Sequence, residues 1–170
     1  MLLNSESGLK NMNAIRKILD DVPLLFRKFT AEDLRNFLSI GHIEYYSQGD
    51  VIVRETDESS HTAYLIADGK LTVWNKNIHL ADMHVGDFLG EPFLYNKSKR
   101  SATVKVESDS VVIRFDREET LQFFRSQPER LFKTFIMNIM EIQHGKIISM
   151  NSKLVKLKQQ LLYKDNTGNS

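Results

Sequence analysis

The sequence predicts a mainly β fold with flanking helices, and three observations lead to this prediction. Between residues 41 and 115, short β-like runs alternate with turn residues, and no helical pattern separates them. Before residue 38 and after residue 116, apolar residues recur at helical spacing instead. Many short strands without intervening helices are typical of barrels and sandwiches.

Composition limits the class of protein. With 41 % hydrophobic and 26 % charged residues in 170, we expect one globular domain plus an appended helix. A net charge of +1 gives no general attraction to nucleic acid or anionic membrane. The absence of cysteine excludes disulfides and thiolate metal sites. With no secretory signal and no uninterrupted run of 18 apolar residues, we expect a cytoplasmic protein without membrane contact.

The sequence pattern of the N-terminal part predicts an arm followed by helices. Residues 1–12 are polar and small, and we expect a flexible arm. The pattern is helical across residues 13–38, with an interruption at Pro23. Thr30 is a suitable N-cap for the second helix, because Asp33 lies three residues later in its first turn.

The central part predicts six strand segments and one clear hairpin. The expected segments are 43–46, 51–53, 63–74, 78–83, 102–106 and 111–115. Within residues 63–74 the dipeptide Asp68-Gly69 tolerates the positive φ angles of a two-residue turn. We therefore expect a hairpin that turns at these two residues.

The C-terminal part predicts a short helix, a long helix and a tail. The β domain with its N-terminal helices is expected to span residues 13–127, the long helix residues 128–163, and a disordered tail residues 164–170. Eight positions of the long helix alternate in four- and three-residue steps: Ile136, Met140, Gln143, Ile147, Met150, Leu154, Leu157 and Leu161. All of them except Gln143 are apolar. This seam predicts a homodimer, and a lid folded over the chain's own barrel is the alternative.

One stretch, from Gly86 to Val104, carries the chemistry. Gly90 ends a turn, and Pro92 suits the first turn of a short helix whose free N–H groups attract anions. Arg100 can add a guanidinium to the same anion, and Glu91 can accept hydrogen bonds from hydroxyls. An anion next to a diol describes a sugar phosphate.

This stretch resembles the phosphate-binding cassette of cyclic-nucleotide-binding domains, the family of the catabolite activator protein and the regulatory subunits of cAMP-dependent protein kinase. In the family a Gly-Glu pair opens a short helix, and an Arg follows nine or ten residues later, ahead of a small–Ala–Thr–Val strand. Here Glu91 and Arg100 are nine residues apart, and Ser101-Ala102-Thr103-Val104 follows. The resemblance implies an antiparallel double-stranded β-helix, a jelly-roll-like barrel, with N-terminal helices and a long C-terminal helix.

The resemblance also implies a role for each site residue. Glu91 would accept from the ribose 2′-hydroxyl, Arg100 would pair with the exocyclic phosphate oxygens, and Ser101 would add a hydroxyl contact. The implied ligand-binding residues are Gly90, Glu91, Pro92, Phe93, Arg100, Ser101 and Ala102. The ligand would be cAMP or cGMP, with a slight preference for cAMP, and its binding would move the long helix. No cofactor is implied.

Two residues depart from the family pattern. Pro92 and Phe93 stand where the family has an aliphatic and then a small residue, so Pro92 removes an N–H and Phe93 adds a large ring. Helix residues that contact adenine in the activator proteins correspond to Gly145 and Lys146, which have no hydroxyl. The alternative is therefore a degenerate fold that acts as a dimeric interaction module, or that binds another small anion such as a cyclic dinucleotide.

Other signals are weaker. The five histidines never fall in an H-x-H or H-x-x-x-H spacing, and no catalytic motif is visible, so we expect neither a metal site nor an enzyme. The activator proteins continue into a helix-turn-helix domain, whereas this sequence ends soon after the long helix. We expect no direct DNA binding and an effector protein that the sequence does not identify.

Overall fold

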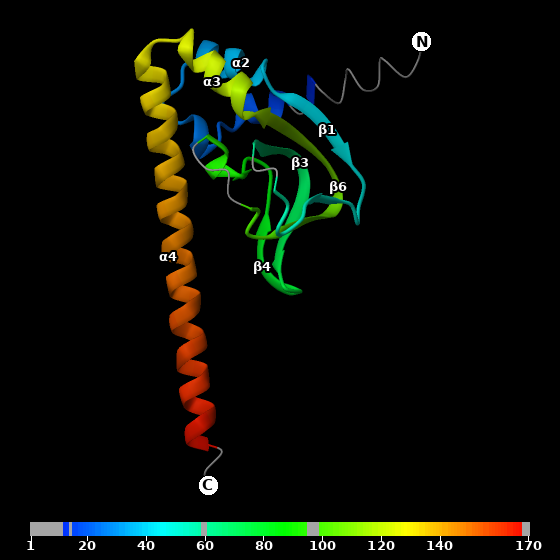
Figure 1. Ribbon diagram of the computed structural model, residues 1–170, viewed down its shortest axis with the longest axis vertical. Coiled ribbons are helices and arrows are strands. Elements are labelled where there is room, and N and C mark those ends of the chain that lie inside the picture. Colours follow the sequence, from blue (N-terminus) through cyan, green and yellow to red (C-terminus); the bar gives the residue numbers. More distant parts are fainter. Residues whose placement is uncertain (1–11, 14, 59–60, 95–98, 168–170) are drawn as a thin grey trace.

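A sheet of antiparallel strands lies below a group of helices, and one long helix runs along its side (Figure 1). The computed structural model describes residues 12–13, 15–58, 61–94 and 99–167, with side chains described up to residue 163. In this part of the chain, no helix has the length and apolar character needed to cross a membrane.

The N-terminal helices form as the sequence predicts. Residues 12–13 and 15–20 are helical, and most of the expected arm lies outside the described residues. The 3-10 helix η1 (Leu24–Phe26) and the helix α2 (Ala31–Leu38) follow. A capping box confirms the predicted start of α2: the Asp33 N–H donates to the Thr30 hydroxyl and the Thr30 N–H donates to the Asp33 carboxylate, both at 3.0 Å.

The sheet has six strands, and two long ones form its centre. The strands are β1 (His42–Tyr46), β2 (Val51–Val53), β3 (Thr62–Asn75), β4 (Ile78–Met83), β5 (Phe88–Leu89) and β6 (Thr103–Asp116). β3 and β6 pair along nearly their whole length. At one end of this pair β5 joins β3 and β1 joins β6, and at the other end β4 joins β3 and β2 joins β6.

The predicted hairpin at Asp68-Gly69 is wrong. β3 continues through both residues, and its register against β6 shifts on either side of them, so the positive φ of Gly69 (91°) belongs to a bulge. A Cβ at Gly69 would lie 2.1 Å from the Ser110 Oγ of β6, which is why only glycine fits. The tight turn comes later, at Lys76 and Asn77, which both have positive φ and connect β3 to β4.

Two further details of the sheet differ from the prediction. The expected segments 102–106 and 111–115 are parts of the single strand β6. The strand order is β1-β6-β3-β4 with β1 and β4 at the two ends, so the antiparallel sheet is confirmed but a closed barrel is not. Because bulges bend β3 and β6, their two ends pair with different neighbours and the sheet curves without closing.

Side chains on the two faces of β3 and β6 build two separate cores. Ala63 and Leu65 of β3 point into the core that also contains helix residues such as Leu34 and Leu131, here called the helix-side core. Tyr64 and Ile66 point into the core whose buried residues all come from strands, here called the sheet-side core. The helix-side core is aromatic around Phe37, whose ring lies 4.9–5.6 Å from the rings of Phe26, Phe115, Phe123, Phe124 and Phe135. The first part of β3 and the last part of β6 are thus buried on both faces.

The C-terminal helices are α3 (Arg117–Arg125) and α4 (Glu129–Thr167). The first half of α4 packs on the helix-side core through Leu131 and Phe135, which are both fully buried. From residue 144 to residue 163 every α4 residue is exposed. α4 continues to Thr167, so four residues of the expected tail are helical, and residues 168–170 lie outside the described part.

Candidate functional site

The site begins at a sharp turn after β5. Gly90 has φ of 85°, and the 3-10 helix η2 (Glu91–Leu94) follows it. The Phe93 N–H donates to the Gly90 carbonyl oxygen at 2.9 Å and fixes the turn. A Cβ at Gly90 would lie 2.8 Å from the Thr62 carbonyl oxygen and 2.9 Å from Nη1 of Arg100. Glycine is therefore required here, and it brings the start of η2 against the Arg100 guanidinium.

Arg100 is held by the edge of the sheet. Its backbone N–H donates to the Asp57 carbonyl oxygen at 3.0 Å, and its carbonyl oxygen accepts from the Thr56 N–H at 2.9 Å. Its Nη2 donates to the carbonyl oxygen and to the hydroxyl of Thr62, both at 2.8 Å. The side chain is thus fixed by β3 and by the loop that follows β2.

The charge of Arg100 is only partly compensated. Burial lowers the pKa of its guanidinium, while Tyr64 and Asp57 act in the opposite direction. Among the residues that the structure describes, no carboxylate lies within 4.0 Å of this guanidinium, and Thr62 offers only neutral oxygens. A partly buried guanidinium with neutral partners retains donors and charge for an anion such as a phosphate.

Glu91 has a different partner. Its side chain is 7 % exposed, and its carboxylate forms an ion pair with the Lys146 ammonium of α4. The same ammonium donates to the Phe88 carbonyl oxygen at 3.3 Å. The long helix therefore contacts the carboxylate that the resemblance assigns to the ribose. No short-range pattern predicts this contact, because the two residues are 55 positions apart.

A pocket of about 330 Å³ lies between η2 and α4. Its lining is mostly apolar and consists of Glu91, Leu94, Ile136, Ile139, Met140, Gln143, His144 and Ile147. Arg100 is not part of this lining. The guanidinium thus faces Thr62 and the carboxylate faces α4, with Gly90 between them.

The remaining predicted site residues differ in accessibility. Phe93 is 1 % exposed and lies in the helix-side core, where its ring centroid is 6.2 Å from that of Phe88. Its side chain is therefore part of the core. Pro92 and Ala102 are partly buried, and Ser101 is exposed, with its carbonyl oxygen accepting from the Asn75 amide at 2.7 Å.

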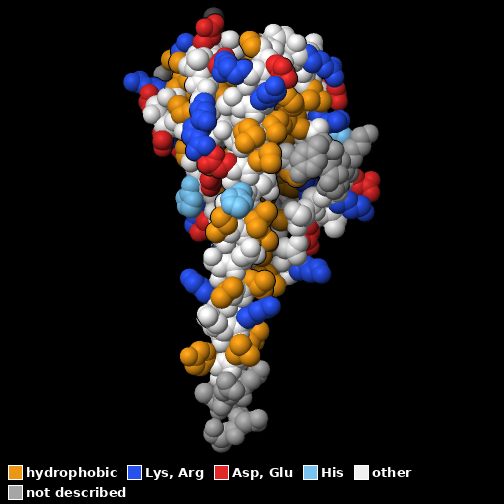
Figure 2. All heavy atoms as spheres, turned by 90° about the vertical axis from the view of Figure 1, so that its left-hand side faces the viewer, with side chains coloured by type: hydrophobic (Ala, Val, Ile, Leu, Met, Phe, Trp, Pro, Cys, Tyr) orange, Lys and Arg blue, Asp and Glu red, His pale blue; other side chains and the backbone are white. Residues whose placement is uncertain are grey.

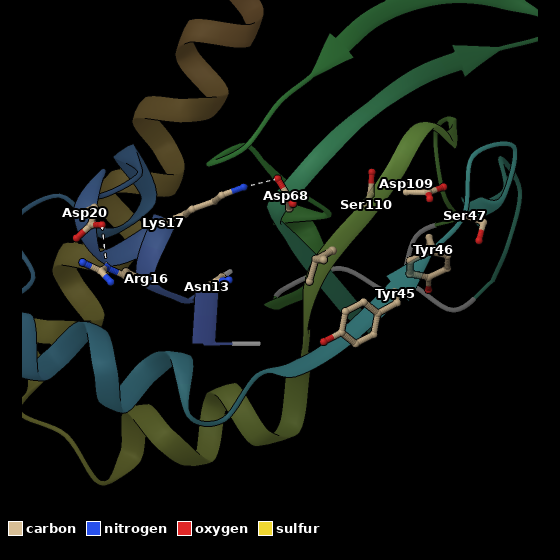
Figure 3. A pocket seen from close by; sticks show the side chains of 11 residues that line it. Asn13, Arg16, Lys17, Asp20, Tyr45, Tyr46, Ser47, Asp68, Asp109 and Ser110 are labelled. Atoms are coloured by element: carbon tan, nitrogen blue, oxygen red, sulfur yellow. Dashed lines mark hydrogen bonds and ion pairs between the residues drawn. The ribbon is translucent and has the colours of Figure 1, made fainter. Parts of the chain in front are cut away.

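A larger hollow of about 580 Å³ lies elsewhere, between the N-terminal helix and the sheet (Figure 3). Its charged side chains pair with one another: Lys17 contacts Asp68 at 2.6 Å, and Arg16 contacts Asp20 at 3.6 Å. None of the predicted site residues lines it. With its cations already paired, this hollow is less suited to an anion than the surroundings of Arg100.

Histidine spacing in the sequence did not predict one group of possible metal ligands. His42, Asp116 and Glu119 come from β1, β6 and α3, and their ligand atoms lie within 4.8 Å of one another. His42 Nε2 is 2.8 Å from the Glu119 carboxylate, and Asp116 also accepts from the Arg114 guanidinium. The Arg114 charge compensates Asp116 and opposes a cation at this place.

The comparisons with known proteins agree on one family. The sequence profile of the cyclic nucleotide-binding domain matches residues 43–127. The chain is similar to cGMP-dependent 3′,5′-cGMP phosphodiesterase A of Dictyostelium discoideum, with 30 % identity over 142 residues, which cover 81 % of this chain and 16 % of the relative. It is 28 % identical over 154 residues to human cGMP-dependent protein kinase 2, covering 83 % of this chain and 20 % of the relative.

The fold matches as well. The catabolite activator protein of Thermus thermophilus superposes with a TM-score of 0.68 at 23 % identity, covering 79 % of this chain and 63 % of that chain. The chain spans only about a fifth or less of the two curated relatives, so the likeness concerns one domain of each. With its Gly90-Glu91 turn, its Arg100 and its antiparallel sheet, this chain belongs to the cyclic nucleotide-binding domain family.

Proposed function

We propose that the chain binds a cyclic nucleotide and that Arg100 binds its phosphate. The observation that carries this proposal is a partly buried guanidinium with only neutral partners, placed against the Gly90 turn. A cyclic phosphate has one negative charge, and burial of that charge without a cation costs several kcal/mol. A single guanidinium at this position matches that need in charge and in geometry.

The backbone of η2 offers few donors, which increases the importance of Arg100. Pro92 has no N–H, and the Phe93 N–H already donates to Gly90. The cradle for the phosphate therefore depends on the guanidinium more than a cradle with several free N–H groups would. This is the expected consequence of the two residues that depart from the family pattern.

The base is proposed to be adenine or guanine. The two curated relatives described above are named for cGMP, which makes cGMP a candidate of equal rank with cAMP. Both nucleotides therefore belong in the test.

We further propose that the second half of α4 pairs with the same segment of a second copy. Six seam residues remain 52–67 % exposed: Met140, Ile147, Met150, Leu154, Leu157 and Leu161. Figure 2 shows hydrophobic side chains continuing down α4 below the body of the domain. Most helical stability in proteins comes from packing of an apolar face, and a two-fold copy offers a complementary seam for this one. This supports a dimer over a lid, because a lid would cover these residues.

Calorimetry with cAMP, cGMP and a cyclic dinucleotide tests the proposed ligand. The wild-type chain is expected to bind one cyclic mononucleotide, and Arg100→Ala should lose about 3–5 kcal/mol, more than 100-fold in affinity. Arg35→Ala, which removes an exposed guanidinium on α2, is the matched control and should bind normally. Circular dichroism would establish that both variants are folded.

Two results would contradict this function. No heat with any of the three ligands at millimolar concentration would favour the alternative, an interaction module that has lost its ligand. Normal binding by Arg100→Ala would place the phosphate elsewhere. Heat from the cyclic dinucleotide alone would retain the site but change the class of ligand.

A further inference from the structure

Lys146 contacts the carboxylate that the family resemblance assigns to the ribose. Its ammonium pairs with the Glu91 carboxylate and donates to the Phe88 carbonyl oxygen, so it contacts the chain on both sides of Gly90. In the family resemblance, Glu91 accepts from a ribose hydroxyl. The same carboxylate oxygens therefore have two possible partners, one within the chain and one on the ligand.

The ion pair compensates a buried charge. Among the described residues, Lys146 is the only cation within 4.0 Å of Glu91, whose side chain is 7 % exposed, while the Lys146 side chain is 43 % exposed. A buried carboxylate without a cation is costly. The Lys146 ammonium reaches Glu91 from a helix that is itself exposed at this point, so the pair joins a buried anion to a half-exposed cation.

The second half of α4 is attached to the sheet mainly by lysines. Ile142 is the last α4 residue that packs against the helix-side core. Beyond it, Lys146 contacts Phe88 and Glu91, and Lys153 donates to the Leu80 carbonyl oxygen of β4 at 2.9 Å. These two lysines are seven residues apart and lie on the same face of the helix. The exposed Lys153 contact is weak, and a ligand hydroxyl that replaces Lys146 at the buried Glu91 carboxylate would disturb no apolar packing.

We propose that Lys146 is the affinity-setting residue of the site, an internal competitor that the ribose must displace from Glu91. This inference depends on the proposed cyclic nucleotide function. Because one carboxylate serves both partners, nucleotide binding releases this point of α4, and any change that releases α4 strengthens nucleotide binding. The two effects are reciprocal by thermodynamic linkage.

The test compares Lys146→Met with Lys156→Met, which removes an exposed ammonium from the same helix. Calorimetry with cAMP and cGMP should show about tenfold tighter binding by Lys146→Met, within the usual range of coupling between sites, and no change for Lys156→Met. Methionine keeps the length and helix propensity of lysine, so the fold should be maintained. Thermal melting of each variant checks this.

A double-mutant cycle with Glu91→Gln isolates the pair. In the Glu91→Gln background, Lys146→Met should no longer change the affinity, because the competition has already been removed. Hydrogen exchange gives an independent measurement: saturating nucleotide should speed exchange of the α4 amides at residues 143–155 in wild type. In Lys146→Met the same amides should exchange fast without ligand.

The outcomes separate this inference from the proposed function. Nucleotide binding by wild type with unchanged or weaker binding by Lys146→Met would overturn the competition and leave the function intact. If the wild-type chain shows no binding heat and Lys146→Met binds nucleotide, the result would strongly support the competition. If neither the wild-type chain nor any variant binds a nucleotide, both the competition and the proposed function would be overturned.

Discussion

The two halves of α4 form one uninterrupted helix, yet their surroundings differ completely. In the first half, Leu131, Phe135 and Ile139 are buried against the helix-side core. The Asn138 side chain donates hydrogen bonds to one carbonyl oxygen within η1 and one just after it. In the second half, from residue 144, every described side chain is exposed (Figure 2). Both halves carry apolar residues at helical spacing, so the difference comes from what the rest of the chain offers them.

The largest effect is expected from Phe135→Ala in the first half. The Phe135 ring lies 4.9–6.4 Å from those of Phe29, Phe37 and Phe124, and its loss should lower the free energy of unfolding by about 3–5 kcal/mol. Leu157→Ala, at a side chain that is 56 % exposed, should change it by less than about 0.5 kcal/mol in the monomer. Urea denaturation at low protein concentration measures both, and equal losses would contradict the difference between the halves.

The second prediction concerns association through the second half. Leu154→Glu places a carboxylate on the seam of both copies and should weaken the proposed dimer by at least about 2 kcal/mol, or 30-fold. Gln159→Glu adds the same charge off the seam and should have little effect. Sedimentation over a concentration series measures the association constant. A wild-type chain that stays monomeric at every concentration would disprove the dimer.

The third prediction compares two asparagines of α4. The Asn138 amide donates to the carbonyl oxygens of Leu25 and Arg27 at 2.9 and 2.8 Å, and the side chain is buried. Asn138→Ala leaves these acceptors without their donor and should cost about 1–3 kcal/mol in urea denaturation. Asn151→Ala, at an exposed position of the second half, should be nearly neutral. A costly Asn151→Ala would show that the second half has a partner within the chain.

The smallest effect is expected where α2 meets the start of α4. Burial would raise the pKa of Asp33, but hydrogen bonds from Thr30 and Arg130 outweigh it and lower the pKa below its ordinary value. A lowered folded-state pKa stabilises the fold above the unfolded-state pKa, and this contribution is lost as the pH falls through the folded-state value. Thr30→Ala should cost about 1 kcal/mol at neutral pH.

Asp33→Asn provides the pH control for this cap. Its stability should depend less on pH than that of wild type below about pH 4, where an unfolded Asp binds a proton. Thermal melts between pH 2.5 and pH 7 would measure the difference. Parallel curves for the two proteins would show that the Asp33 carboxylate makes no contribution.

Local signals predicted most of the fold. The cap at Thr30 and the long amphipathic helix depend on neighbouring residues, and both are present. The hairpin at Asp68-Gly69 was wrong because this dipeptide indicates positive φ and does not distinguish a turn from a bulge, a choice made here by the close approach of Ser110. The actual turn lies at Lys76 and Asn77, where no glycine marks the positive φ angles.

The site was predictable in composition but not in contacts. The resemblance of the stretch with Glu91 and Arg100 to the family's cassette implied an anion site, and Gly90 brings the start of η2 against Arg100. The burial of Phe93 and the pairing of Lys146 with Glu91 depend on how α4 and the helix-side core pack against η2. No pattern within a short window of sequence contains that information.

The pairing of β3 with β6 has a consequence for how the chain reaches this structure. Thr62 pairs with Asp116 and Trp74 with Thr103, so the central ribbon joins segments made far apart in time on the ribosome. A nascent chain that ends before residue 103 has β3 but not the strand that pairs with it along nearly its whole length. High contact order of this kind slows folding and exposes apolar strands to aggregation. Folding of the nascent domain therefore waits for β6.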